Sequence, residues 1–105
     1  MLAVLLTLLY WTRYNLQIII PLDELTPHHI DRETLEASVE RSHRWEVRSL
    51  REHLKDSGSR KQAIFCVVHG GTDVELRTKS VEYLTELPWD GYAIGGSLGM
   101  SFLFK

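Results

Sequence analysis

Three short apolar runs divide the chain, and the segments between them have the spacing of helices. Residues 16–22 and 63–68 form the first two runs, and the third follows the turn signal Asp90-Gly91. Uninterrupted apolar runs of this length are typical of strands buried on both faces. Pro21 weakens the expectation for the last two residues of the first strand, because proline cannot donate to a ladder of hydrogen bonds.

The long segment after the first run has apolar residues at helical spacing. This pattern predicts a helix from Arg32 to about Lys55, with Asp31 as its N-cap. We expect the charged residues to form a solvated face, and the last turn to be capped by Gly58. The expected buried stripe consists of Leu35, Val39, His43, Val47, Leu50 and Leu54.

A second helix is predicted between the second and third strands. Residues 72–75, Thr-Asp-Val-Glu, have the pattern of a capping box, and Pro88 stops the helix. Its expected buried side consists of Leu76, Ser80, Tyr83, Leu84 and Leu87. Because strands and helices alternate, we expect an α/β fold with about three parallel strands and two to three helices.

Residues 1–15 form an apolar N-terminal segment, for which we expect a helix, and residues 16–105 form the remaining domain. The run from Met1 to Trp11 is shorter than the roughly 20 residues of a membrane span. It also lacks the basic start and cleavage site of a signal peptide. We interpret it as a helix with a divergent beginning or an artefact of how the gene was delimited, with a membrane anchor as the alternative.

Composition narrows the class of protein further. The 105 residues suffice for one small domain, and a net charge of −2 provides no overall basic field for nucleic acid. Cys66 is the single cysteine, which excludes an internal disulfide, and inside an apolar run it is expected to be a small core residue. We expect a cytoplasmic protein and no metal site, since His28-His29 has no companion ligands at a suitable spacing.

Each apolar run ends in residues that could bind a ligand. Asp23 follows the first run, His69-Gly70-Gly71 the second and Gly95-Gly96 the third. The carboxyl ends of parallel strands lie at one edge of a sheet, so these groups are expected to share a rim. Structural alternatives stay open: Asp23 could cap a turn, His69 could pack against its neighbours, and the glycines could serve tight turns.

The same three stretches resemble one known family. Residues 90–96, Asp-Gly-Tyr-Ala-Ile-Gly-Gly, resemble the substrate-binding segment of the tRNA-guanine transglycosylases, the queuine tRNA-ribosyltransferase family. Asp23-Glu24 with Thr26-Pro27 is similar to its Asp-Glu-x-Thr-Pro segment, and residues 67–71 are similar to its Val-Gln-Gly-Gly segment. The resemblance covers about residues 18–99 and implies a fragment of a (β/α)8 TIM barrel.

The resemblance also implies a function. Members of the family exchange guanine at the wobble position of the tRNA anticodon for queuine or a related 7-deazaguanine base, in queuosine biosynthesis. It assigns base binding to Asp23, to His69 in place of the usual glutamine, and to the backbone of Gly95 and Gly96. The side chain of Asp23 would accept hydrogen bonds from the ring N–H and the amino group of the base.

Other parts of the family's machinery have no counterpart in these residues. Neither of the family's two catalytic aspartates has a counterpart here, so we expect the chain alone to be inactive. The cysteines and histidine of the family's zinc site are also missing, so we expect the zinc to belong to the full-length family member. The resemblance implies tRNA and a 7-deazaguanine base as partners, and a homo- or heterodimer in the full-length form. A non-catalytic relative or accessory subunit, which binds base or partner without chemistry, is the alternative.

Overall fold

The computed structural model describes residues 17–55 and 62–95, in which strands and helices alternate. The elements are β1 (Ile18–Ile19), α2 (Arg32–Lys55), β2 (Ala63–Val68), α3 (Val74–Thr85) and β3 (Gly91–Ile94). The strands are parallel and lie in the order β1-β2-β3. The predicted α/β class with parallel strands is therefore confirmed for this part of the chain, with two helices.

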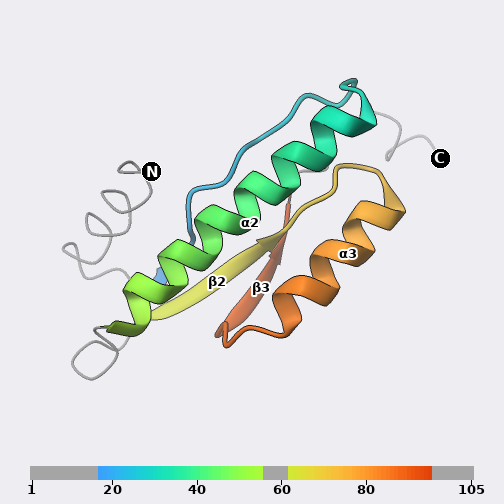
Figure 1. Cartoon of the computed structure of the whole chain (residues 1–105). Helices are drawn as coiled ribbons and strands as arrows, with labels where there is room; N and C mark the ends of the chain where they lie inside the picture. Colours follow the sequence, from blue (N-terminus) through green and yellow to red (C-terminus); the bar gives the residue numbers. More distant parts are fainter. Residues whose placement is uncertain (1–16, 56–61, 96–105) are drawn as a thin grey trace.

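Both helices cover the same face of the sheet (Figure 1). Alternate side chains of β2, from Ile64 to Val68, belong to one buried cluster with Leu50 of α2 and Leu84 of α3. Because side chains of a strand alternate between faces, this cluster defines the helix-covered side. Cys66 lies in it with no exposed surface, as expected, and burial raises the pKa of its thiol to about 12.

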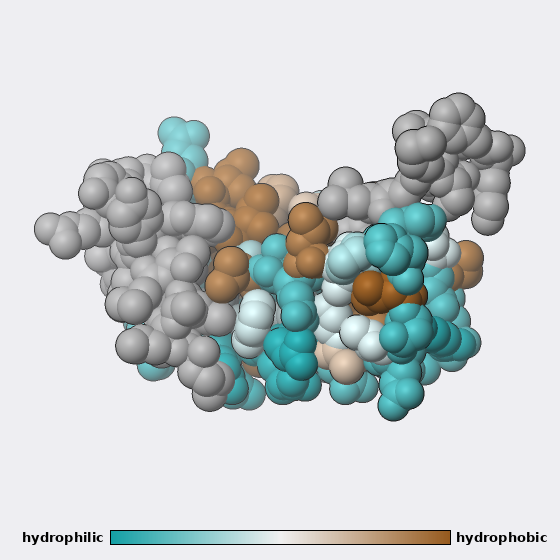
Figure 2. Space-filling model, turned by 90° about the horizontal axis from the view of Figure 1, so that it is seen from above, coloured by the Kyte–Doolittle hydropathy of each residue, from teal (hydrophilic) through white to brown (hydrophobic). Residues whose placement is uncertain are grey.

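The sheet itself carries exposed apolar side chains. Ile94 of β3 is 86% exposed, and Tyr92 and Ile18 are about half exposed. Seen from above, apolar surface gathers in patches among hydrophilic side chains (Figure 2). On the side of β2 away from the helices, Phe65 lies over Gly91, where an added Cβ would be 2.4 Å from the ring. A larger residue at the start of β3 would therefore require the Phe65 ring to move.

The first strand is shorter than predicted. The expected range was 16–22, but β1 contains only Ile18 and Ile19. The Ala63 N–H donates to the Gln17 carbonyl at the start of this pairing, and the pairing ends before Pro21. The absence of an N–H on Pro21 explains why the chain leaves the sheet early, and it does so before it reaches Asp23.

The helix boundaries agree more closely with the sequence. The predicted range of α2 is confirmed, and Asp31 caps it by accepting the Thr34 N–H at 2.8 Å. Helix α3 is capped by Asp73, which accepts the Leu76 N–H at 3.0 Å, so it begins one residue later than the capping-box pattern suggested.

Three side chains on these helices differ from expectation. Leu54 is 45% exposed because it lies in the last turn of α2, near the end of the described helix. Tyr83 is 47% exposed and stacks on His43 instead of entering the core. Glu46 was expected on the solvated face and is fully buried.

Several predictions fall outside the described residues. These are the helix expected in residues 1–15, the C-cap at Gly58, the backbone of Gly96 and the tail 97–105. Within the described ranges, neither helix is long and apolar enough to cross a membrane.

Candidate functional site

The predicted site residues that the structure describes lie at one edge of the sheet. Asp23 follows β1, His69 follows β2 and Gly95 follows β3, and the strands are parallel. The distance from His69 Nε2 to Asp23 Oδ2 is 3.9 Å. The structure therefore brings the acid and the imidazole together as the sequence predicted, although residues 23 and 69 are 46 positions apart in the chain.

His69 is held rigidly although it follows a strand end. Its backbone N–H donates to the Ser80 hydroxyl at 3.0 Å, and only 4% of the residue is exposed. Its ring nitrogen Nε2 has no hydrogen-bond partner. A buried polar atom without a partner is uncommon and marks a position where a water or ligand can bind.

The Ser80 hydroxyl is itself fixed from the other side. It lies 2.8 Å from Nε2 of His43, whose ring stacks on Tyr83 with centroids 4.9 Å apart. Burial, together with the nearby His69, lowers the pKa of His43 to about 4, so this ring is neutral at pH 7. His43 was predicted to be a packing residue on the α2 stripe, and the structure confirms that it is buried there.

Glu46 is a residue that the sequence reasoning missed. Its side chain on α2 has no exposed surface, and Oε1 accepts the Val67 N–H of β2 at 2.6 Å. Oε1 also lies 3.8 Å from His69 Nε2, while Oε2 has no hydrogen-bond partner. The signal was its spacing, because Glu46 is three residues after His43 and four before Leu50, on the buried stripe.

Arg77 was also missed, and it connects the strand ends. Its guanidinium donates from Nη1 to the Val68 carbonyl at 3.0 Å and from Nη2 to the Gly95 carbonyl at 2.6 Å. Its Nε donates to the Gly71 carbonyl at 2.8 Å. Three donors in a rigid fork can hold three carbonyl groups at fixed positions. Burial lowers the pKa of Arg77 from its ordinary value. No local sequence pattern reveals this role.

The glycine pair after β2 is needed for the shape of this edge. Gly70 and Gly71 have φ values of 135° and 56°, which side chains rarely adopt. A Cβ on Gly70 would lie 2.6 Å from the backbone nitrogen of Arg77. The positive φ values, and at Gly70 the close approach to Arg77, are therefore sufficient to explain why both positions are glycine.

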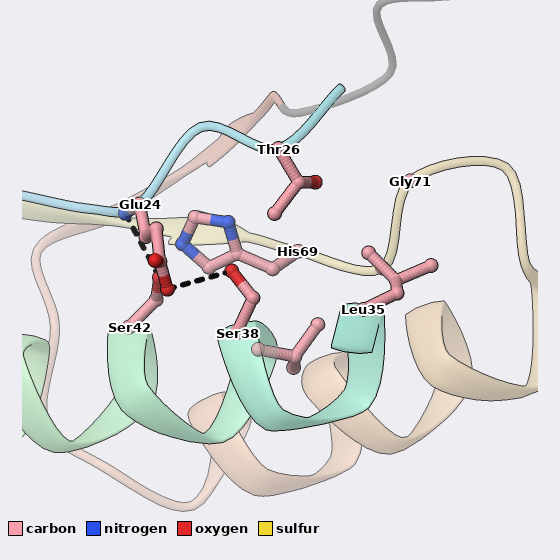
Figure 3. A pocket seen from close by; sticks show the side chains of 9 residues that line it. Glu24, Thr26, Leu35, Ser38, Ser42, His69 and Gly71 are labelled. Atoms are coloured by element: carbon pink, nitrogen blue, oxygen red, sulfur yellow. Dashed lines mark hydrogen bonds between the residues drawn. The ribbon is translucent and has the colours of Figure 1, made fainter. Parts of the chain in front are cut away.

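A small cavity lies beside His69. Figure 3 shows the imidazole between the segment that carries Glu24 and Thr26 and the α2 side chains of Ser38 and Ser42. The volume of this cavity, about 10 Å³, is enough for about one water molecule and too small for a heterocycle. A flat ligand at Asp23 and His69 would have to lie on the open side of the rim.

The described residues contain no group of three or more histidine, cysteine or acidic side chains placed to hold a metal ion. A surface ion pair of Arg32 with Glu75 at 2.9 Å joins the first turns of α2 and α3. The rim presents a carboxylate, an imidazole and main-chain groups, all of which can form hydrogen bonds.

Comparisons with known proteins identify the family. The family model described as queuine tRNA-ribosyltransferase matches residues 12–102. A curated protein named queuine tRNA-ribosyltransferase from Protochlamydia amoebophila is 57% identical over 82 residues, which cover 78% of this chain and 21% of that protein. Proteins with the same name from Chlamydia pneumoniae and Chlamydia caviae are 51% and 49% identical over 82 residues. The chain spans about a fifth of the length of these relatives. On this match, the chain belongs to the queuine tRNA-ribosyltransferase family.

Proposed function

We propose that these residues form the base-reading side of a tRNA-guanine transglycosylase pocket. The complete protein would exchange guanine at the tRNA wobble position for queuine or a related 7-deazaguanine base. The observation that supports this proposal is the placement of Asp23 and His69, whose polar atoms lie 3.9 Å apart at the ends of adjacent parallel strands.

The two side chains offer complementary hydrogen-bonding groups. The Asp23 carboxylate has two acceptor oxygens, which suit the ring N–H and amino group of a guanine-like base. His69 Nε2 has no hydrogen-bond partner among the described residues, but it is buried, so donation to the neighbouring ring carbonyl requires the imidazole to turn towards the open side of the rim. An acceptor beside a donor therefore fits the edge that guanine and 7-deazaguanine share.

We further propose that the sheet is part of a (β/α)8 barrel. Helices cover one face of three parallel strands. Ile94 and Tyr92 on β3 are exposed, and in a barrel the helix that follows each strand would cover such side chains. In such a barrel the carboxyl ends of the strands form the active-site face, which is where Asp23 and His69 lie.

The chemical step would come from residues outside these 105. By family resemblance, one aspartate attacks the ribose and a second handles protons, as in retaining glycosyl transfer. The zinc of the family does not fit the residues described, because Cys66 of β2 is buried under the helices and no suitable cluster of ligands surrounds it in the described ranges. This chain alone would bind the base without exchanging it, with tRNA binding and dimer formation left to the full-length form in the cytoplasm.

Calorimetric titration of the chain with 7-deazaguanine tests the proposal. We expect Asp23→Asn to weaken binding about tenfold to a hundredfold, because hydrogen bonds to a charged acceptor contribute about 1.5–3 kcal/mol. Glu82→Gln, which removes a charge from the exposed face of α3, serves as the matched control and should bind as the parent does. Equal affinity of Asp23→Asn and the parent chain would refute the assignment of Asp23.

A further inference from the structure

The segment that carries Asp23 has no regular structure of its own. Residues 20–31 connect β1 to α2 without a helix or strand. Loops of this kind are normally more mobile than the elements they join. A base-binding carboxylate must nevertheless hold its position, because hydrogen bonds weaken steeply when their distance and angle depart from the preferred geometry. Contacts other than secondary structure must therefore hold Asp23 in place.

Glu24, the next residue, is attached to α2 by both its main chain and its side chain. Its N–H donates to the Ser42 hydroxyl at 3.0 Å, and its Oε2 accepts from the Ser38 hydroxyl at 2.9 Å (Figure 3). Nη1 of Arg41 donates to both carboxylate oxygens, at 3.0 and 2.7 Å. These three partners lie within one turn of the helix.

The helix side of this attachment is firm. Ser38 and Ser42 are buried, and both line the small cavity beside His69. The same turn of α2 therefore contacts the segment of Asp23 on one side and His69 on the other. Because adjacent Cα atoms are fixed about 3.8 Å apart, a fixed Glu24 backbone limits where Asp23 can be.

We propose that Glu24 is the positioning residue that sets the Asp23 carboxylate opposite His69. This inference rests on the proposed base-binding role of Asp23, and it adds a residue that does not itself need to contact the base. Its carboxylate is used entirely on α2, with acceptor contacts to Ser38 and Arg41.

The test compares Glu24→Ala and Glu24→Gln with the parent chain. We expect Glu24→Ala to weaken 7-deazaguanine binding about tenfold to a hundredfold, because a displaced Asp23 carboxylate would lose its hydrogen bonds to the base, while the chain keeps a cooperative melting transition. Glu24→Gln should bind with intermediate affinity, because its amide oxygen can still accept from Ser38. Glu40→Ala, an exposed acidic residue beside Arg41 in the sequence, is the matched control and should bind as the parent does.

A second readout does not depend on the ligand. Amide hydrogen exchange at residue 24, whose N–H donates to Ser42, should accelerate at least tenfold in Glu24→Ala, while exchange at His69 stays as in the parent. Unchanged exchange at residue 24 would overturn the positioning role, even if the parent chain failed to bind the base. Parent-like affinity in Glu24→Ala would overturn it as well. Where Glu24→Ala does not fold, the same two measurements on Glu24→Gln decide the matter.

Discussion

Replacing Arg77 with alanine is expected to lower the free energy of unfolding by about 2–4 kcal/mol, because three charge-assisted hydrogen bonds are lost together. The guanidinium joins the carbonyl groups of Val68 at the end of β2, Gly71 in the turn between β2 and α3, and Gly95 directly after β3. The edge that carries the proposed site should loosen, so affinity for 7-deazaguanine should fall as well.

Urea denaturation of three variants measures this effect. Arg77→Lys should recover only a small part of the loss, since a single ammonium cannot reach three carbonyl groups in a fork. Lys79→Ala is the matched control on the same helix, where the removed contacts are exposed ion pairs with Glu75 and Glu36 that contribute at most about 1 kcal/mol. A loss in Arg77→Ala no greater than that in Lys79→Ala would show that the fork does not hold the strand ends.

The second large effect is expected at Glu46. Glu46→Leu should lower the free energy of unfolding by about 1–3 kcal/mol, because the Val67 N–H would lose its acceptor inside the core. Glu46→Gln should stay within about 1 kcal/mol of the parent chain, since an amide oxygen of nearly the same size can accept the same N–H.

The order of the two Glu46 variants is the informative result. Chemical denaturation of both, with Glu40→Gln as a control on the exposed face of α2, compares a variant that loses the acceptor oxygen with one that keeps it. If Glu46→Leu were as stable as Glu46→Gln, the hydrogen bond to Val67 would not be what holds this part of β2.

The order and type of the elements could be predicted from the sequence because they depend on local patterns. The apolar run 63–68 forms β2 with the predicted limits, and α2 begins at its predicted cap. The meeting of Asp23 and His69 followed from topology alone, since parallel strands place their carboxyl ends at one edge. The end of β1 at Ile19, two residues before Pro21, was only partly anticipated.

The residues that shape the site could not be predicted in the same way. Arg77 donates to carbonyl groups up to 18 positions away in the chain. Glu46 accepts one N–H from Val67, which is 21 positions away on β2. Such contacts depend on how each helix is rotated against the sheet, which single-sequence patterns fix only roughly. Glu24 stood within a recognised motif, yet its role became visible only when Ser38, Arg41 and Ser42 were placed around it.

The central claim is that the ends of three parallel strands bind one flat heterocycle. Titration of the ¹⁵N-labelled chain with 7-deazaguanine, followed by amide chemical shifts, tests it most directly. We expect the resonances of Asp23, His69 and Gly95 to shift together with one dissociation constant, while those of Ala63 and Gly91 at the opposite strand ends stay unchanged. Shifts confined to the opposite ends, or no shift at saturating base, would contradict it.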